Sequence, residues 1–518
     1  MGSLSRREMI RWTVVGGVGA VLVGCGSEQT QGFVNPEPQY LVMHKTDTGG
    51  PPPGDYWYQG NPSSVNQTGI DEILHGIGER GGPTRRLAFS YSLSYLNYPL
   101  SAEQQVLSSL LALAEANDLP VLVHLDGVNW WNTRPDLWNW WDPTSPGYNP
   151  TNVDNVEWCG WNPADAVKIG WRNWGSQIRV PPQPNLASPI FMAAQKEKLD
   201  ALIPMIAQWY QKLPPDRRYL LAGVVLGWET STFVQFYYYP DGNSYLEKYP
   251  QDASHDPTGG LQDSIPLGYA GLTSLGRTHG GQITAQDMDG VISHYLEYVT
   301  GIAAQLGLPR SKLLTHSITS TALIGPQRQQ CSHGMGALTT HAMPGWSFYN
   351  DGPVAAETLL STIDQTPWGA VEFQPFGLSV ALFDRFYAYR NCRFVDVFNW
   401  ESARGNPSAL AAIIGALRAA PKSLLSPAQG LAARVHKGRV DLSWQPGTGT
   451  AEARLQVARG SALDSGGELA EPKVLDAPGA QPGKHSLALP AGTYYWTVVE
   501  RAADGTRLAS DVQSFSIS

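Results

Sequence analysis

Eight short apolar runs, most of them separated by amphipathic stretches, restrict the fold of this chain more than any other feature. Most of the runs are almost continuously apolar, which is typical of parallel strands buried on both faces. Strands that alternate with helices indicate β-α-β units, and eight units in about 380 residues predict a (β/α)8 (TIM) barrel. The expected strands are Tyr40–His44, Arg86–Ser92, Pro120–Asp126, Leu220–Glu229, Lys312–Ser317, Ala337–His341, Ala370–Gln374 and Phe394–Trp400.

Helical periodicity fills most of the segments between these runs. The fifth and sixth units are the weakest, because no clear helix separates Ser317 from Ala337. An open doubly wound sheet is the alternative, but no glycine-rich phosphate loop follows the first run. We therefore expect a barrel with long loops over residues 39–422. Its expected helices are Ile70–Arg80, Ala102–Asn117, Ala193–Gln211, Ala285–Leu306, Val354–Ile363, Leu378–Arg390 and Ser408–Ala419.

Residues 424–518 have a different, all-β pattern. Val440–Trp444 and Thr493–Val499 alternate as half-buried strands do, and Gly/Pro turns separate the remaining segments. This pattern predicts a small β-sandwich. Leu489–Val498 and the turn Ala503–Gly505 resemble a bacterial fibronectin type III-like module, which implies an immunoglobulin/fibronectin-like sandwich.

Residues 1–25 have the pattern of an export signal. A basic stretch precedes a short, glycine-rich apolar run, Trp12–Gly24, that is too short to span a bilayer comfortably. Ser5–Arg7 resembles a twin-arginine signal, and Leu22–Cys25 resembles a bacterial lipobox, in which the cysteine is lipidated. We expect an exported protein, anchored through Cys25 to the cell envelope on its periplasmic or extracellular face, with residues 26–38 as a tether. An ordinary signal peptide with an incidental cysteine is the alternative.

The charge balance argues against nucleic acid as a partner. The chain carries 36 Lys+Arg against 45 Asp+Glu, a formal net charge of −9. Proteins that bind phosphate backbones cluster their Lys and Arg residues, and this chain has no basic run beyond its N-terminus.

Three cysteines remain after Cys25: Cys159, Cys331 and Cys392. Export permits one disulfide with one cysteine left over, and none of them has zinc-finger spacing. The pairing stays open, and buried structural thiols are the other account.

The ends of the predicted strands supply the candidate site residues, because barrels of this type build their sites there. Glu229 ends the fourth run and Glu372 lies in the seventh. A carboxylate inside an apolar strand is costly unless it is paired, so each could also be a structural glutamate with a partner. The other candidates for substrate binding at this end are His44, Tyr91, His124, Asp126, Trp228, His316, His341, Gln374, Trp400 and Glu401.

Two glutamates on these strands suit glycoside hydrolysis. One carboxylic acid protonates the leaving oxygen, and the other carboxylate attacks the anomeric carbon or activates water. The arrangement resembles the clan A glycoside hydrolases. The resemblance implies that Glu229 is the acid/base, that Glu372 is the nucleophile, that the reaction is retaining and that Trp400 floors the sugar site. The chain departs from it at Trp228, where many members carry asparagine.

Tryptophan is concentrated in one loop of the predicted barrel. Nine of the 18 Trp residues lie between Trp130 and Trp174, directly after Asp126. Because an indole face stacks on the apolar face of a sugar ring, we expect Trp130 and Trp131 to bind substrate. Most of the others are expected to form a small core within the insertion. The aromatic residues of 233–239 are expected to form the opposite wall.

Two other functions stay open. His44, His124, His316 and His341 with Asp126 could ligate a metal, as in amidohydrolase-like barrels, but the His-x-His typical of their first strand is missing. A non-catalytic, lipid-anchored carbohydrate-binding protein is the third candidate, because barrels host many functions. We expect a glycosidase that acts on a poly- or oligosaccharide without metal or cofactor, and that meets the membrane only through its lipid.

Overall fold

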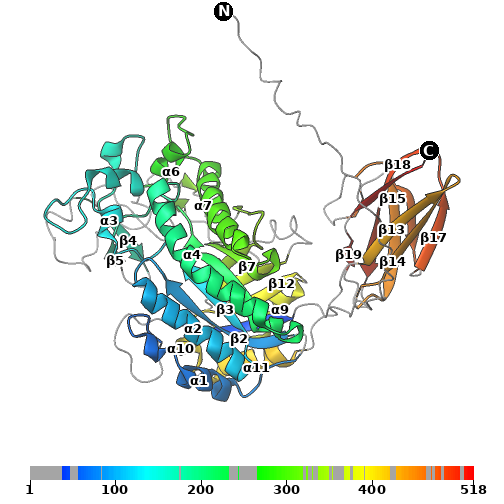
Figure 1. Cartoon of the computed structure of the whole chain (residues 1–518), viewed down its shortest axis with the longest axis horizontal. Coiled ribbons are helices and arrows are strands. Elements are labelled where there is room, and N and C mark those ends of the chain that lie inside the picture. Colours follow the sequence, from blue (N-terminus) through cyan, green and yellow to red (C-terminus); the bar gives the residue numbers. More distant parts are fainter. Residues whose placement is uncertain are drawn as a thin grey trace, which may run out of the picture. The chain divides into compact units, whose positions relative to one another are not determined.

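In the computed structural model, eight parallel strands close into a barrel (Figure 1). Each barrel strand pairs with the barrel strands before and after it in the chain, and the last returns to pair with the first. This order confirms the predicted (β/α)8 fold. The strands are β1 (Gln39–Lys45), β2 (Arg85–Ser94), β3 (Val121–Asp126), β6 (Leu221–Thr230), β7 (Leu313–Ile318), β10 (Gly345–Phe348), β11 (Trp368–Phe373) and β12 (Cys392–Val397).

The structure describes part of the chain. The described residues are 38–46, 57–82, 85–173, 177–232, 243, 265–318, 323–324, 329–330, 336–348, 353, 367–373, 377–389, 391–419, 428–447, 449–461, 468–469, 473–479, 483–501, 507–510 and 512–517. The expected helix Val354–Ile363, the expected export signal, residues 26–37 of the expected tether, and the expected aromatic wall at 233–239 lie outside them.

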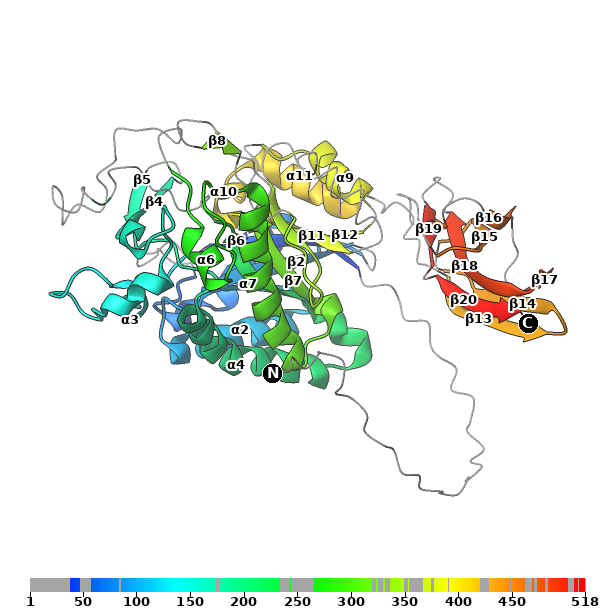
Figure 2. The same cartoon turned by 90° about the horizontal axis from the view of Figure 1, so that it is seen from above.

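Helices cover the outside of the barrel. Helices α2, α4 and α7 lie side by side, and α11 contacts both α9 and α1 (Figures 1 and 2). Among the six longer helices of the described residues, five begin after an Asn, Ser or Thr whose side chain accepts a hydrogen bond from the first turn, which satisfies an otherwise unpaired N–H group. The helices are α1 (Gln67–Ile77), α2 (Leu100–Asn117), α4 (Pro189–Lys212), α7 (Ala285–Gln305), α9 (Val380–Ala388) and α11 (Pro407–Arg418).

Alternation along the strands separates two cores. Inward residues such as Val42 and Phe394 fill the barrel. Outward residues such as Met43 and Val395 pack in the larger core that includes the helices. Two positions beyond these inward residues, His44 and Asp396 are buried and polar. The barrel interior therefore changes from apolar to polar at the carboxyl ends of its strands.

The sixth strand is not where the sequence predicts it. Residues 337–341 form no strand, and the sixth strand is Gly345–Phe348. A Cβ on Gly345 would lie 2.2 Å from the carbonyl oxygen of Thr315 on β7, so the close approach of the two backbones requires glycine. The Pro-Gly pair that indicates a turn in the sequence therefore leads directly into a strand.

A long insertion follows β3. It contains α3 (Pro135–Trp138) and a hairpin of β4 (Gly170–Asn173) and β5 (Gln177–Val180), which Figure 2 shows together at one end of the barrel. The loop after β6 contributes α6 (Tyr269–Ser274). A short ladder joins β8 (Leu323–Ile324) to β9 (Gln329–Gln330), and α10 (Trp400–Ala403) follows β12.

Two antiparallel sheets form the C-terminal part of the chain, as predicted. One has the order β13-β14-β17, and the other has the order β16-β15-β18-β19 with β20 also paired to β18. Their apolar residues form a single core, which makes the two sheets a sandwich; Leu442, Leu455 and Trp496 belong to it. The strands are β13 (Gln429–His436), β14 (Arg439–Gln445), β15 (Glu452–Ala458), β16 (Lys473–Pro478), β17 (Gly483–Ala488), β18 (Gly492–Arg501), β19 (Arg507–Ala509) and β20 (Gln513–Ile517).

Two of the cysteines are described, and both are free thiols. Cys159 is partly exposed and Cys392 is buried, whereas Cys25 and Cys331 lie outside the described residues. None of the described helices combines the length and the apolar character needed to cross a bilayer.

Candidate active site

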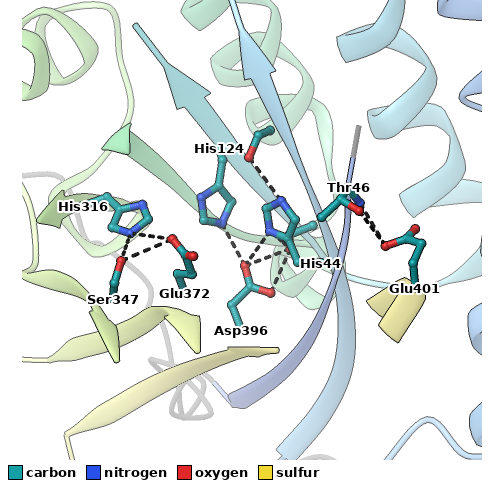
Figure 3. Close-up of polar contacts among 10 residues, drawn as sticks. His44, Thr46, His124, His316, Ser347, Glu372, Asp396 and Glu401 are labelled. Carbon is teal, nitrogen blue, oxygen red and sulfur yellow. Dashed lines mark hydrogen bonds and ion pairs between the residues drawn. The ribbon is translucent and has the colours of Figure 1, made fainter. Parts of the chain in front are cut away.

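Buried polar side chains from all eight barrel strands meet at the carboxyl end of the barrel. Figure 3 shows several of them turned toward one another across the interior. Most of the predicted strand-end residues are here, together with others that the sequence did not single out. The group is His44, Ser90, His124, Asp126, Glu229, His316, Ser347, Glu372 and Asp396.

Glu229 lies at a distortion of β6. From Leu226 to Thr230, β6 advances four residues while the paired strand β7 advances two. Gly227 has a φ of +86° and Glu229 a φ of +42°. A left-handed φ costs a residue with a side chain on the order of 1–3 kcal/mol, and such strain clusters at functional sites. The distortion holds Glu229 buried at the end of the fourth strand.

Glu372 is placed by a β-bulge in β11. Trp346 of β10 pairs with Ala370 and the next residue, Ser347, pairs with Glu372, so β11 has one extra residue. The bulge allows two consecutive residues to face inward: Val371 belongs to the barrel core, and Glu372 reaches the polar layer above it. Bulges commonly re-aim a side chain beside an active site.

A short hydrogen-bond chain ends on Glu372 (Figure 3). Ser347 Oγ donates to Glu372 Oε2 over 3.2 Å, and His316 Nε2 lies 2.7 Å from Ser347 Oγ and 3.5 Å from Glu372 Oε2. Because the serine hydroxyl has one hydrogen, its oxygen is left to accept from His316. Burial and the nearby His124 and His44 hold the pKa of His316 well below its usual value, so His316 is a neutral donor.

The two glutamates interact electrostatically. Burial raises the pKa of Glu372 well above its ordinary value, and the charge of Glu229 raises it further. Two carboxyl groups in this situation favour one proton between them, with one acid and one carboxylate. The pair can therefore donate a proton to a bound substrate and present a negative charge to it at the same time.

Asp396 is the centre of a second network, deeper in the barrel. Its carboxylate contacts His44 Nδ1 at 3.1 Å and His124 Nε2 at 2.9 Å, and accepts from Ser90 Oγ at 2.9 Å. Burial alone would raise the pKa of Asp396, but the charge and hydrogen bond of His44 and the hydrogen bond of His124 hold it at about 2. Burial lowers the pKa of His124 to about 4. Asp396 is therefore a buried, ionised anchor at neutral pH.

The same three side chains are the described residues that could hold a metal ion. One ligand atom from each of His44, His124 and Asp396 lies within 4.8 Å of the others. Two imidazoles and a carboxylate form a donor set that suits zinc and similar cations. The predicted metal set is therefore changed, because Asp396 joins it and His316, His341 and Asp126 are not part of this cluster.

Trp228 covers the histidines. Its ring centroid lies 5.0–5.2 Å from those of His44, His124 and His316, and 5.5 Å from that of Phe398. Its carbonyl oxygen accepts from Asn129 Nδ2 over 2.9 Å. The residue that departs from the glycosidase pattern is thus the aromatic group at the middle of the site.

The prediction that Trp400 floors the site is wrong. Trp400 is fully buried in the outer core, and a Cβ on Gly76 of α1 would lie 3.3 Å from its ring. Asn399, with a φ of +70°, turns the chain into α10 directly before Trp400. The aromatic ring beside Trp228 at the end of the eighth strand is that of Phe398, which directly follows β12.

Three further candidates lie away from the glutamates. Tyr91 is fully buried beside Trp57 in the outer core, because the inward positions of β2 are Ser90 and Ser92. His341 precedes the sixth strand and lies half-exposed, with Nε2 3.5 Å from Glu297 Oε1 of α7. Glu401 Oε1 lies 3.3 Å from the buried Lys45 Nζ, and its Oε2 accepts from Thr46 (Figure 3). Glu401 therefore ties α10 to the end of β1.

The tryptophan-rich insertion is mainly a small core of its own. Trp131 is fully buried against Phe191, and its indole N–H donates to the carbonyl of Pro182. The indole groups of Trp138, Trp140 and Trp158 likewise donate to carbonyl groups of the insertion. Trp130 is half-buried and stacks with Arg172, whose guanidinium carbon is 4.5 Å from the ring centroid. Trp174 and Gln374 lie outside the described residues.

Asp126, at the end of β3, is a loop anchor. Its Oδ1 accepts from the backbone N–H groups of Val128 and Asn129 at 2.9 and 3.0 Å. Burial raises its pKa, which these hydrogen bonds and the charge of Arg172 partly offset. Asp126 therefore shapes the start of the insertion beside Glu229.

Asp396, Ser90, Ser347 and Arg172 were not among the residues predicted from the sequence. A signal for Asp396 exists, because it follows Phe394 by two positions in an inward-facing series of an otherwise apolar run. The same alternation of inward and outward positions, applied to β2, would have selected Ser90 instead of Tyr91. Arg172 has no comparable signal, since it lies in an insertion without periodicity.

No protein-family model and no curated protein match the sequence. Several solved structures give remote alignments, and three of them illustrate the range. A double mutant of a Cellulomonas fimi endo-β-1,4-mannanase aligns over 92% of this chain and 94% of its own, at 11% identity and a TM-score of 0.33. A Bacillus thuringiensis chitinase aligns over 87% of this chain and 67% of its own, at 10% identity and a TM-score of 0.17. A Pectobacterium carotovorum pectate lyase aligns over 17% of this chain, at 15% identity and a TM-score of 0.14; this chain spans 26% of that protein.

Proposed function

We propose that this protein is a glycoside hydrolase that cleaves a poly- or oligosaccharide with two glutamates. The observation that carries the proposal is the presence of two buried glutamates, Glu229 and Glu372, at the carboxyl ends of the fourth and seventh strands of the barrel. Glycoside hydrolysis needs one carboxylic acid and one carboxylate, and the pKa of Glu372 is raised in the way that keeps a proton available. The distortions of β6 and β11 support a functional role for both residues.

The aromatic groups beside the glutamates suit a sugar substrate. Trp228 directly precedes Glu229, and its ring packs against Phe398 and against His316, the histidine nearest Glu372; Trp130 is half-buried at the start of the insertion. Aromatic faces bind the apolar faces of sugar rings, while neighbouring polar groups bind hydroxyls. The site therefore offers the two kinds of surface that a carbohydrate presents.

The experiment compares Glu229→Gln and Glu372→Gln with the wild-type protein on a panel of glycans. Each variant keeps the shape of the side chain and removes its acid–base chemistry, so we expect hydrolysis to fall at least 100-fold in both. Glu157→Gln is the matched control, because Glu157 is a buried glutamate of the insertion that contacts Ala270 N instead of the site. Hydrolysis that survives both site substitutions would refute the proposal, and binding without cleavage would favour a carbohydrate-binding protein.

A retaining outcome belongs to the same proposal. Carboxyl groups about 5–5.5 Å apart act by retention, and those about 6.5–9.5 Å apart act by inversion. Proton NMR of the first-formed product identifies the anomer directly. The opposite anomer from the substrate would reject retention and leave the glycosidase assignment intact.

A metal-dependent hydrolase is the second candidate, and the cluster of His44, His124 and Asp396 favours it. In that case the three side chains would hold the ion that activates water. Elemental analysis of the purified protein and activity after chelation separate the two functions. Stoichiometric zinc with loss of activity in chelator would support the second candidate, and full activity in chelator would support the first.

We also propose that the chain is exported and held at the cell envelope by a lipid on Cys25. The basic residues, the short apolar run and the lipobox-like Leu22–Cys25 support this placement. A carbohydrate-cleaving enzyme at that position would act on polymers outside the cytoplasm.

A further inference from the structure

Two serines of β2 face the barrel interior beside His44, and they contact different nitrogens of its ring. Ser90 Oγ lies 2.9 Å from Nδ1, and Ser92 Oγ lies 3.2 Å from Nε2. Side chains of a strand alternate between its two faces, so Ser92 is the next inward position toward the carboxyl end of β2. Ser90 is fully buried, whereas Ser92 is partly exposed. Ser92 is therefore the hydroxyl of the two that a molecule in the barrel mouth can meet.

The neighbours of His44 Nδ1 determine which nitrogen of the neutral ring carries the hydrogen. Asp396 Oδ2 lies 3.1 Å from Nδ1, and an ionised carboxylate can only accept hydrogen bonds. Ser90 donates its single hydrogen to Asp396 over 2.9 Å, so its oxygen is also left to accept from Nδ1. We therefore assign the hydrogen to Nδ1, which leaves Nε2 as an acceptor. Ser92 then donates its hydroxyl hydrogen to Nε2.

A continuous chain thus joins a hydroxyl to a carboxylate through the two nitrogens of one imidazole. Its two contacts are 3.2 Å from Ser92 to His44 and 3.1 Å from His44 to Asp396. This is the order of groups that activates a serine nucleophile. The histidine takes the hydroxyl proton, and the aspartate holds the ring in the correct tautomer and stabilises the imidazolium that forms. The same constellation occurs on unrelated folds and is identified by its geometry.

His44 is held in this orientation from several sides. The ring centroids of Trp228 and Phe398 each lie 5.2 Å from that of His44, and the centroid of His124 lies 4.9 Å away. His124 Nε2 also contacts Asp396 at 2.9 Å, which fixes the carboxylate (Figure 3). A histidine that only compensated a buried carboxylate would not need its second nitrogen on a partly exposed hydroxyl. The packing instead keeps Nε2 on Ser92.

We propose that Ser92, His44 and Asp396 form a nucleophilic triad that hydrolyses carboxylic esters through an acyl group on Ser92. This activity goes beyond the proposed glycosidase function and does not use the two glutamates. The rings of Trp228 and Phe398 beside His44 supply apolar surface for the acyl group. Because Ser92 is only partly exposed, the site suits the ester of a short, apolar carboxylic acid.

The reaction has two balanced stages. Ser92 Oγ bonds to the ester carbonyl carbon while its proton passes to His44 Nε2, and the electron pair of the C=O bond moves to its oxygen. That pair then returns, the bond to the alcohol oxygen breaks, and this oxygen takes the proton from His44. In the second stage water adds to the acyl carbon and gives a proton to His44. The bond to Ser92 then breaks, and Ser92 Oγ recovers the proton. Asp396 stays ionised throughout.

A fluorophosphonate reagent tests the nucleophile directly, because it forms a covalent adduct with activated serines. The full chain is treated in the presence of chelator, and mass spectrometry locates the adduct. We expect one adduct per molecule, on Ser92, and none in Ser92→Ala. Ser317→Ala is the matched control: Ser317 ends β7 at the same end of the barrel, and its hydroxyl has no hydrogen-bond partner among the described residues. This variant should react as the wild type does. A folded wild-type protein without an adduct, or with the adduct elsewhere, would overturn the proposal.

The part played by His44 and Asp396 is read from the rate of labelling. Asp396→Asn should react about 100-fold more slowly or less, because the ring loses the group that holds its tautomer. Circular dichroism checks that the variant is folded. If it is not, Ser92→Cys replaces it, since this variant keeps a nucleophile on an unchanged histidine. Its thiol should react with iodoacetamide at least about 10-fold faster than free N-acetylcysteine at pH 7. A normal labelling rate in folded Asp396→Asn, or an ordinary thiol in Ser92→Cys, would overturn the triad.

Turnover is measured on the 4-nitrophenyl esters of acetic and butyric acid. In chelator, we expect an initial burst of about one nitrophenol per molecule, as an acyl-enzyme requires. The burst should be absent from Ser92→Ala. Ester hydrolysis that needs a metal, or that continues in Ser92→Ala, would contradict the proposal and favour the metal-dependent hydrolase. These readouts do not depend on glycan cleavage, so the triad and the glycosidase function can fail separately.

Discussion

Replacement of Asp396 by asparagine should cost stability that depends on pH in a predictable way. The carboxylate is fully buried, and His44, His124 and Ser90 hold it ionised. Its pKa falls from 3.8 to about 2 on folding. A group whose folded pKa is depressed contributes stability above its unfolded pKa and loses that contribution as the pH falls through the folded value.

The size of the effect follows from the same shift. At 1.36 kcal/mol per unit, the charge contributes about 2 kcal/mol at pH 7 and about 1 kcal/mol at pH 3. For a barrel of roughly 380 residues, 2 kcal/mol corresponds to a decrease in Tm of about 3 °C at neutral pH. The asparagine amide also faces imidazole N–H groups that the carboxylate accepted. That mismatch adds a roughly pH-independent cost of about 1–3 kcal/mol.

Differential scanning calorimetry of the wild-type protein and Asp396→Asn at pH 7, 5 and 3 measures both parts. We expect the difference in Tm to be largest at pH 7 and to narrow by pH 3. Asp136→Asn serves as the control, because Asp136 pairs with Arg134 at an exposed position and should change Tm by less than about 1 °C. If the difference in Tm between the two proteins stays constant from pH 7 to pH 3, the charge of Asp396 contributes nothing to the stability.

Three other predictions concern separate parts of the chain. Burial raises the pKa of Glu157 from 4.5 to about 8, so the wild-type protein should lose stability as the pH rises from 5 to 8, and Glu157→Gln should flatten that slope in urea titrations. Trp400→Ala should lower the free energy of unfolding by about 3–5 kcal/mol, whereas Phe398→Ala should mainly raise KM. Equal effects of the two substitutions on KM would contradict the placement of Trp400 in the outer core and of Phe398 at the site. Cys25→Ser should move the protein from the membrane to the soluble fraction of fractionated cells, and unchanged membrane association would reject the lipid anchor.

Much of the fold could be predicted from the sequence because buried parallel strands leave continuous apolar runs. Seven of the eight strands lie where these runs predict them. The exception is β10, which has four residues and begins at Gly345, where the neighbouring backbone approaches too closely for any side chain. A strand this short carries little pattern, and glycine normally indicates a turn. The long-range contact that requires glycine is not visible in the local sequence.

Only part of the candidate site could be predicted. The sequence shows where the strands end, but it shows less well which way each side chain points. Glu229 and Glu372 both lie at the predicted end of the barrel, yet each reaches the interior through an irregular strand. Tyr91 and Trp400 were placed by their proximity to strand ends, although strand parity and the turn at Asn399 direct them outward. The alternation of inward and outward residues along β2 could have excluded Tyr91 from the predicted site. The turn at Asn399 and the approach of Arg172 depend on tertiary packing, which no local pattern reports.

The irregular strands also determine how relatives of this protein should be sought. Relative to their neighbours, β6 contains two extra residues before Thr230 and β11 contains one before Glu372. Sequence comparison normally penalises insertions inside strands. In a homologue whose β11 is regular, the acidic residue that corresponds to Glu372 would therefore be aligned one position away from it. A profile that permits gaps at these two points would align the functional glutamates even where the rest of the barrel has diverged.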